Sequence, residues 1–174
     1  FSVNPVYVNY WKQSKANEKN NQKILLVNQP SKKRLLVEIL SDVFKAIVFT
    51  RTKHGADKVV RYLKEKGLES TAIHGNKSQG QRQRSLEMFK KDKINILVAT
   101  DIAARGIDID EVSHVVNFDM PNVPESYVHR IGRTARAGSA GSALTFLTRD
   151  DRLMWNLISK LIDPNYKEEF SHNK

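Results

Sequence analysis

Short apolar runs alternate along the chain with segments in which apolar residues recur every three or four positions. The runs are residues 23–27, 46–49, 71–73, 94–99, 112–118 and 144–147. Each is short and mainly apolar, which is typical of strands that are buried on both faces of a sheet. The pattern therefore predicts about six strands, with a further short extended run at residues 6–10.

Helices are predicted in the segments between these runs. One segment carries the stripe of an amphipathic helix and ends at Gly67. Another begins at Ser78, where Gln81 completes a capping box, and a third has Pro124 in its first turn. The apolar stripes expected to face the core are Ala56, Val59, Val60 and Leu63; Leu35, Leu36, Ile39 and Leu40 after Ser31; Leu86 and Phe89; and Leu153, Met154, Leu157, Ile158, Leu161 and Ile162 in the last helix.

This alternation also predicts the fold class. Strands and helices joined by short connections indicate βαβ units, and hence an α/β fold with a mainly parallel sheet and helices on both faces. The length of 174 residues favours a single domain. Residues 12–21 are polar and predict a linker or an exposed loop, and the tail after Pro164 is also polar.

Composition narrows the function classes. The chain has 29 Lys and Arg against 19 Asp and Glu, and this net charge of +10 favours a polyanionic partner, most commonly nucleic acid. The alternative is that the charge only aids solubility. The absence of cysteine excludes a disulfide framework, a thiolate zinc site and a cysteine nucleophile.

The sequence shows no pattern of a membrane span or of a secretion signal. No apolar run approaches the ~20 residues that span a bilayer. The first residues carry no signal-peptide pattern, so we expect a cytoplasmic protein without a membrane partner. The chain begins with Phe1 rather than Met, and we therefore expect a fragment or a processed product.

Candidate ligand-binding residues follow three of the predicted strands. Ligands of parallel α/β sheets bind beyond the carboxyl ends of the strands. Residues 50–52, 74–76 and 100–108 occupy such positions and are rich in threonine, glycine and arginine, which suit phosphate. Capping and turn chemistry explains one such loop, but three favour an anion-binding surface. Gln79 and Arg82 share a helix face, either as a phosphate-contacting pair or as a solvated surface pair.

Residues 129–136 hold one histidine and three arginines, the densest cluster of its kind in the chain. If the preceding helix persists, one face carries His129, Gly132, Arg133 and Arg136. No carboxylate lies nearby in the sequence, so we expect unpaired guanidinium groups that await an anionic ligand. Salt bridges to distant acids are the second interpretation. The chain has no G-x-x-x-x-G-K-[ST] loop, so it is not expected to hold a triphosphate and Mg²⁺ by itself.

Four segments resemble, in order, the motifs of one family. Residues 48–52 (V-F-T-R-T) resemble motif IV, residues 79–82 (Q-G-Q-R) the Q-x-x-R motif, residues 99–108 (A-T-D-I-A-A-R-G-I-D) motif V, and residues 129–136 (H-R-I-G-R-T-A-R) motif VI. From about residue 23 to residue 162, the chain resembles the second RecA-like lobe, or helicase C-terminal domain, of a DEAD-box RNA helicase. Residues 50–57 and 74–79 look closest to the bacterial RhlE-like subgroup.

The resemblance implies a RecA-like three-layer αβα domain at residues 22–162. Residues 1–21 would be the interlobe linker and lead-in segment, and residues 163–174 a polar tail. The parent protein would be an RNA-stimulated ATPase that uses ATP and Mg²⁺, both bound mainly by a first RecA-like lobe that this chain lacks. Its partners would be that first lobe and single-stranded or short duplex RNA, bound without sequence preference. The isolated chain is expected to be almost inactive.

The resemblance also implies roles for individual residues. The catalytic group would be the arginine fingers Arg133 and Arg136, with His129. Contacts to ATP would come from Gly106, Asp108, Arg133 and Arg136. RNA would be bound by Arg51, Thr52, Gly75, Gln79, Arg82 and Thr100. Coupling between the lobes would involve Arg105, His129 and Arg130.

Two other functions stay open from the sequence. One is a stand-alone RNA-binding module without ATPase activity of its own, which the missing first lobe would suit. The other is a helicase of a different branch that acts on DNA. The motif VI pattern argues against the DNA helicase, although contacts to the phosphate backbone do not by themselves separate RNA from DNA.

Overall fold

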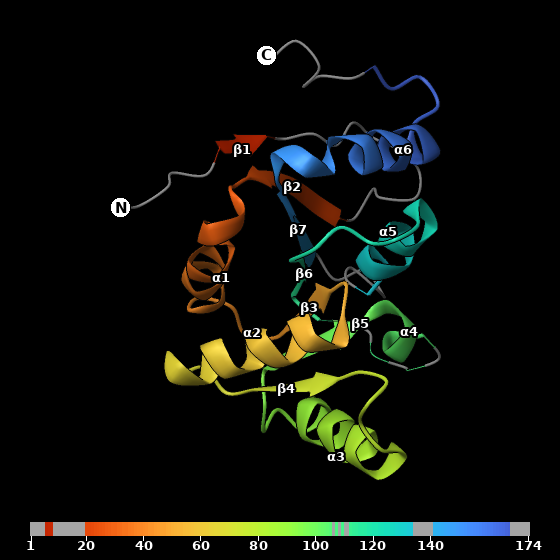
Figure 1. The fold of residues 1–174 in the computed structure, drawn as a ribbon. Coiled ribbons are helices and arrows are strands. Elements are labelled where there is room, and N and C mark those ends of the chain that lie inside the picture. Colours follow the sequence, from red (N-terminus) through yellow and green to blue (C-terminus); the bar gives the residue numbers. More distant parts are fainter. Residues whose placement is uncertain are drawn as a thin grey trace.

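The computed structural model describes residues 6–8, 20–105, 107, 109, 112–133 and 141–167. Its strands form one seven-stranded sheet in the order β1-β2-β7-β6-β3-β5-β4 (Figure 1). The strands are β1 (Val6–Val8), β2 (Asn20–Leu26), β3 (Ala46–Thr50), β4 (Ser70–Ile73), β5 (Ile96–Thr100), β6 (His114–Asn117) and β7 (Gly141–Leu147).

Six α-helices and two short 3₁₀ helices connect the described strands. The α-helices are α1 (Lys32–Leu40), α2 (Lys53–Glu65), α3 (Gln79–Lys90), α4 (Asp101–Ala104), α5 (Pro124–Ile131) and α6 (Arg152–Ile162). The 3₁₀ helices η2 (Gln29–Ser31) and η4 (Arg149–Asp151) lead into α1 and α6. None of the described helices is long and apolar enough to cross a membrane.

The sheet confirms the predicted α/β fold. The edge strand β1 pairs antiparallel with β2, whereas β2 to β7 pair parallel with their neighbours. Parallel pairing brings the carboxyl ends of these strands to one edge of the sheet. Thr50 of β3 is in register with Thr100 of β5, and Ile73 of β4 is in register with Ala99 of β5.

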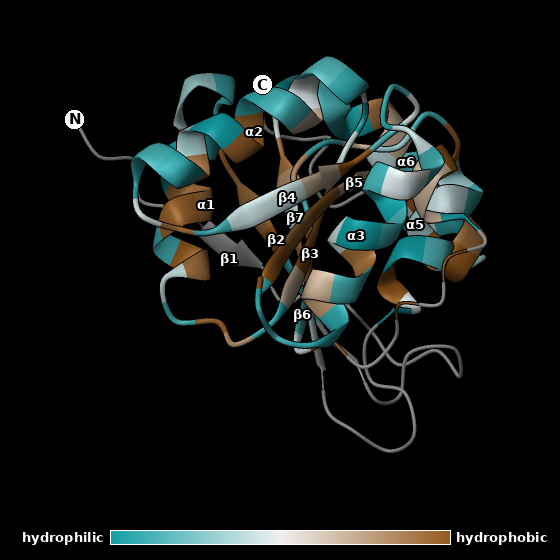
Figure 2. Cartoon of the chain, turned by 90° about the horizontal axis from the view of Figure 1, so that it is seen from below, coloured by the Kyte–Doolittle hydropathy of each residue, from teal (hydrophilic) through white to brown (hydrophobic). Residues whose placement is uncertain are grey.

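Helices cover both faces of the sheet, which explains why the central strands β3 and β5 are buried along their whole length. Helices α1 and α2 pack on one face, and α3 to α6 pack on the other. Within β3, Ala46 and Val48 belong to the first core, whereas Ile47 and Phe49 belong to the second. Figure 2 shows the brown, apolar strands between helices whose outer sides are teal and polar.

Local signals at the helix ends are confirmed. The Ser78 hydroxyl oxygen accepts from the Gln81 backbone N–H, and the Gln81 side chain accepts from the Ser78 N–H, which is the predicted capping box. Gly67 follows the end of α2 with φ +81°, a left-handed conformation that glycine adopts without the Cβ penalty. Pro124 occupies the first turn of α5.

Two expectations need correction. Strand β2 begins at Asn20 rather than at residue 23, because its polar first residues pair with β7.

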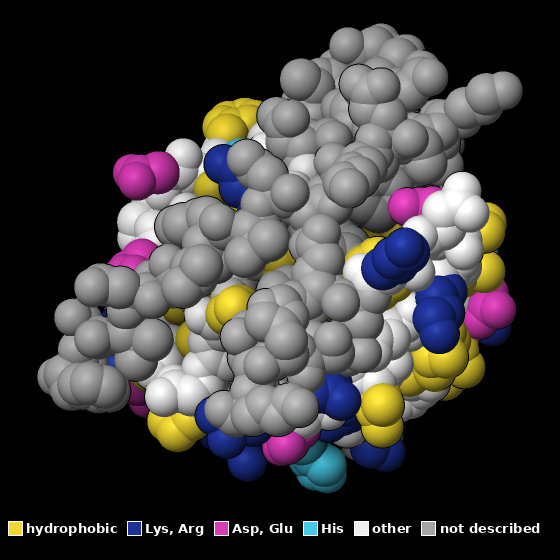
Figure 3. All heavy atoms as spheres, turned by 90° about the horizontal axis from the view of Figure 1, so that it is seen from above, with side chains coloured by type: hydrophobic (Ala, Val, Ile, Leu, Met, Phe, Trp, Pro, Cys, Tyr) yellow, Lys and Arg dark blue, Asp and Glu magenta, His cyan; other side chains and the backbone are white. Residues whose placement is uncertain are grey.

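The expected core face of α6 is wrong for Leu153, Leu157 and Leu161, which are 74%, 53% and 46% exposed. The helix carries two adjacent apolar rows, and the row with Trp155 and Ile158 packs on the sheet. On the face seen in Figure 3, hydrophobic side chains lie at the surface among Lys and Arg.

Candidate functional site

The predicted convergence of three loops at one sheet edge is confirmed. Strands β4, β5 and β3 are consecutive neighbours in the sheet and all run parallel. The segments after them, which begin at His74, Asp101 and Arg51, therefore leave the same edge side by side. Helix α3 follows the first of these segments, α4 follows the second, and α2 follows the third.

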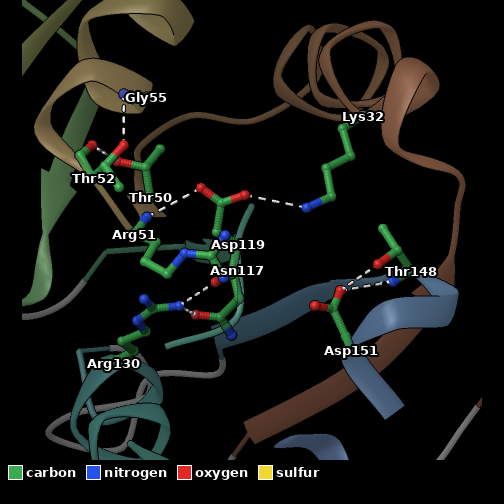
Figure 4. A network of polar contacts seen from close by, with 10 residues as sticks. All are labelled: Lys32, Thr50, Arg51, Thr52, Gly55, Asn117, Asp119, Arg130, Thr148 and Asp151. Atoms are coloured by element: carbon green, nitrogen blue, oxygen red, sulfur yellow. Dashed lines mark hydrogen bonds and ion pairs between the residues drawn. The ribbon is translucent and has the colours of Figure 1, made fainter. Parts of the chain in front are cut away.

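The loop after β3 is held by its own hydroxyl groups. Thr52 caps α2, because its Oγ1 accepts from the Gly55 N–H at 2.9 Å (Figure 4). The buried Thr50 Oγ1 donates to the Thr52 carbonyl oxygen at 3.2 Å. The Arg51 side chain is exposed, whereas its backbone N–H donates to Asp119 Oδ2 at 3.1 Å. Of the predicted RNA-binding pair, Arg51 is thus the accessible cation, and Thr52 shapes the loop.

Asp119 and Lys32 hold this loop in place, and the sequence analysis missed both. The Lys32 side chain is only 4% exposed, and its Nζ lies 3.2 Å from Asp119 Oδ1 (Figure 4). The same Nζ lies 5.4 Å from the centre of the Phe118 ring. The carboxylate thus joins α1 to the loop after β3. Asp119 comes just after β6, so it also lies beyond the carboxyl end of a strand, where functional residues of parallel α/β sheets are expected.

Arg130 corrects the expectation of unpaired arginines. Its Nε and Nη2 donate to the two carboxylate oxygens of Asp101, both at 2.7 Å. Its Nη1 donates to the Asp119 carbonyl oxygen at 2.6 Å and to Asn117 Oδ1 at 3.3 Å. The residue is 1% exposed, and its guanidinium lies 5.1 Å from the centre of the Phe49 ring. The second interpretation, a salt bridge to a distant acid, is therefore correct for this arginine.

Arg130 belongs to a buried polar network between α5 and the strands β6, β7 and β2. Asn117 Nδ2 donates to Thr145 Oγ1 at 3.0 Å, and the Tyr127 hydroxyl lies 3.3 Å from the same oxygen. The Tyr127 hydroxyl also donates to Gln22 Oε1 at 3.0 Å. Burial raises the pKa of Tyr127 to about 12. The network links α5 to the strand β2 at the far side of the sheet.

Arg133 is placed differently from Arg130. Helix α5 ends at Ile131 with Gly132 as its cap, so the expected continuous helix face does not extend through Arg133. Its Nη1 donates to the Ile107 carbonyl oxygen at 2.7 Å, and its Nη2 donates to that of Ala104 at 3.0 Å. These partners are neutral carbonyl groups, and Arg133 forms no ion pair within the described part of the chain.

A pocket between α4 and α5 brings several predicted residues together. It is lined by Phe49, Asp101, Ala104, Arg105, Ser126, His129, Arg130 and Arg133. His129 and Arg105 are exposed, and Arg133 is half-buried. The predicted catalytic and coupling residues that the structure describes therefore surround one cavity. A direct contact from Arg130 to another lobe would require this buried side chain to leave its partners.

The predicted RNA-binding residues on the other loops differ in exposure. Gly75 and Gln79 are exposed, and no heavy atom lies within 4 Å of where a Cβ on Gly75 would stand. Arg82 is half-buried, and its Nε is buried without a hydrogen-bond partner among the described residues. Thr100 is 9% exposed and precedes α4. Gly75 and Gln79 thus lie at the surface, and Arg82 is only partly accessible.

Three predicted residues lie outside the described residues, namely Gly106, Asp108 and Arg136. Within the described ranges, no group of three or more His, Asp or Glu side chains could hold a metal ion. The described residues of the site include cations, hydroxyls and backbone groups, which are ligands for phosphate.

Comparison with known proteins shows which family the chain belongs to. Residues 31–138 match the family described as helicase conserved C-terminal domain. Solved structures of DEAD-box proteins share the fold and are partly identical in sequence. The chain matches the E. coli protein SrmB, bound to regulator of ribonuclease activity A, with a TM-score of 0.75 and 38% identity, over 79% of this chain and 83% of that one. The chain belongs to the helicase C-terminal domains of the DEAD-box RNA helicases.

Further relatives support this family. The C-terminal domain of the DEAD-box protein Dbp5 matches with a TM-score of 0.74 and 32% identity, over 82% of this chain and 84% of that one. DEAD-box ATP-dependent RNA helicase 30 of Arabidopsis thaliana is 46% identical over 140 residues, which are 79% of this chain and 24% of that protein. The helicase C-terminal domain thus spans about a quarter of the length of the curated relatives it matches.

Proposed function

We propose that the chain is the second lobe of an ATP-dependent RNA helicase. It supplies arginine fingers for ATP hydrolysis and half of the surface that binds the RNA backbone. The observation that carries this proposal is the pairing of two surfaces at one sheet edge. The pocket between α4 and α5 gathers Arg105, His129 and Arg133. The exposed residues Arg51, Gly75 and Gln79 lie at the same edge, in the segments that follow β3 and β4.

Arg133 is the described residue best suited to act as an arginine finger. A finger must bring uncompensated positive charge to the transferring phosphoryl group. The carboxylate of Asp101 neutralises Arg130, whereas Arg133 is held by two carbonyl oxygens that orient its guanidinium and leave its charge intact. Arg136 is proposed as the second finger, and Gly106 and Asp108 as contacts to the nucleotide.

ATP and Mg²⁺ are assigned mainly to the first lobe. When bound there, Mg²⁺ would supply positive charge that stabilises the transferring phosphoryl group. Arg105 and His129 are exposed at the mouth of the pocket, where they can couple this lobe to the first one. We place the protein in the cytoplasm, and the RhlE-like assignment rests on residues 50–57 and 74–79.

The RNA surface is proposed to hold phosphates rather than to read bases. Arg51 and Arg82 offer cations, and the open backbone at Gly75 lets a phosphate come close. Gln79 lies at the start of α3, and the nearly buried Thr100 supports the centre of the surface. Contacts of this kind bind RNA with little dependence on sequence.

The first test is ATP hydrolysis at saturating single-stranded RNA. The chain alone is compared with the chain fused at Phe1 to a DEAD-box first lobe, and a matched lobe pair serves as positive control. We expect activity only in the fusion, because closure of two lobes assembles the site. No activity in either protein, together with tight and salt-sensitive RNA binding, would replace this proposal with a stand-alone RNA-binding module.

Arg133→Ala in the active fusion tests the finger. Turnover should fall by about 10³-fold or more, because arginine fingers contribute about 10³–10⁵ in rate, while RNA affinity is retained. Arg61→Ala removes an exposed arginine from α2 and is the matched control. Unchanged turnover in Arg133→Ala would remove this residue from the catalytic group.

A further inference from the structure

We propose that His74 and Asp57 form a positioning pair that fixes the loop between β4 and α3 against α2. This inference rests on the proposed RNA-binding function, which the loop serves through Gly75. His74 directly follows β4, and Asp57 lies on α2. Their part is to set the spacing between two phosphate-binding segments rather than to touch RNA.

The geometry of His74 carries the inference. The residue is 2% exposed, and its Nε2 lies 2.8 Å from Asp57 Oδ1 on α2. Its Nδ1 lies 3.2 Å from the backbone nitrogen of Asn76, which donates the hydrogen bond. An imidazole nitrogen that accepts carries no proton, so His74 is the neutral tautomer with its proton on Nε2. One ring thus joins the α2 carboxylate to the loop backbone two residues ahead.

Other contacts close the same turn. The Lys77 N–H donates to the His74 carbonyl oxygen at 3.0 Å, and Lys53 Nζ donates to Asn76 Oδ1 at 3.2 Å. Both side chains of the Lys53–Asn76 bond are exposed, so this bond contributes little by itself. Lys77 Nζ also lies 3.9 Å from Asp57 Oδ1, but this long ion pair is partly exposed and contributes little. The buried imidazole is therefore the main connection between loop and helix.

The connection matters because of what lies at its two ends. Asp57 lies one turn into α2, whose cap Thr52 follows Arg51. The loop contains Gly75 and leads into Ser78, the cap of α3, so it also sets where Gln79 and Arg82 stand. Gly75 has open space around it, and its position depends on its neighbours. Preorganised spacing raises affinity because less ordering is required on binding.

Nuclear magnetic resonance tests the pair in the free chain. Long-range ¹H–¹⁵N correlation should show the Nε2–H tautomer for His74, and the Asn76 amide should be protected from exchange. His74→Gln assigns the ring signals. A His74 ring protonated on Nδ1, or an Asn76 amide that exchanges equally fast in wild type and Asp57→Ala, would overturn the inference.

RNA binding by the lobe fusion tests the consequence. Asp57→Ala should raise the Kd for single-stranded RNA about tenfold and leave the slope of log K against log salt unchanged, because no phosphate contact is lost. Asp57→Asn keeps an oxygen acceptor for Nε2 and should recover part of the affinity. Glu65→Gln removes an exposed carboxylate from the same helix and serves as control.

The outcomes separate the two proposals. Equal RNA affinity in wild type and Asp57→Ala would overturn the positioning pair alone. A lower salt slope in Asp57→Ala would also overturn it, because that result indicates loss of a direct phosphate contact. A wild-type fusion that binds no RNA, although the Nε2–H tautomer and the protected Asn76 amide are present, would instead overturn the proposed function.

Discussion

Two arginine-bearing helices at the same sheet edge use their arginines in opposite ways. Arg130 of α5 is 1% exposed, and all three of its nitrogens donate hydrogen bonds within the domain. Arg82 of α3 is half-buried, and its Nε has no partner among the described residues. The first guanidinium holds the domain together, whereas the second forms no ion pair among the described residues, so its charge is available to an anionic ligand. A family motif therefore does not assign a role to an arginine until its partners are known.

The physical cause of the difference is where the carboxylates lie. Removal of a charge from water costs several kcal/mol, so Arg130 is buried only because Asp101, the Asp119 carbonyl oxygen and Asn117 Oδ1 compensate it. Helix α3 places no acid beside Arg82 and contains one acid, Glu87, which forms a pair with Lys91 at 3.8 Å. The edge therefore contains a neutralised interior next to a positively charged surface.

The largest expected effect is on stability. Arg130→Leu should lower the free energy of unfolding by about 3–5 kcal/mol, because it leaves the partly buried carboxylate of Asp101 without its partner. Urea unfolding of the chain measures this change, with Arg61→Leu as an exposed control that should stay within about 0.5 kcal/mol. A loss below about 1 kcal/mol would place Arg130 in the same class as surface arginines.

The second prediction concerns pH. Burial raises the pKa of Tyr127 to about 12, above the value of about 10 in an unfolded chain. As pH rises, the Tyr127 hydroxyl therefore loses its proton in the unfolded state before it does so in the folded state. The contribution of Tyr127 to stability is fully present below about pH 10 and is lost as pH rises towards about 12. Between about pH 9 and about pH 11, wild type should lose about 1 kcal/mol more stability than Tyr127→Phe.

Urea unfolding of both proteins at the two pH values measures this difference. All other tyrosines are the same in the two proteins, so they cancel. Equal losses would mean that Tyr127 is accessible to water and that the network beneath the sheet is open.

Local sequence patterns predicted much of the fold but little of the buried network. Strand β3 and the capping box at Ser78 depend on neighbours within a few positions, and both were correct. Arg130 meets Asp101 from 29 positions away, and Lys32 meets Asp119 from 87 positions away. Strand order brings these groups together, and the sequence prediction left that order undetermined.

Helix α6 shows the same limit for packing. Two adjacent apolar rows have similar hydrophobicity, so periodicity does not decide which row faces the sheet. The choice depends on Trp155, whose ring meets that of Tyr127 in a T-shaped contact with centres 5.4 Å apart. The convergence of the loops at one edge was easier to predict from the sequence, because a parallel sheet places the carboxyl ends of its strands at the same edge whatever the strand order.

The smallest effect on stability is expected at Arg82, where the substitution should instead weaken RNA binding. Arg82→Ala leaves no buried acceptor behind, so the free energy of unfolding should change by about 0.5 kcal/mol or less. In the lobe fusion, RNA affinity should weaken for all sequences, and the slope of log K against log salt should fall by about 1. Arg84→Ala, an exposed arginine on the same helix, is the matched control and should leave the slope unchanged. An unchanged slope in Arg82→Ala would return this arginine to the solvated surface, and the contrast with Arg130 would then be one of burial alone.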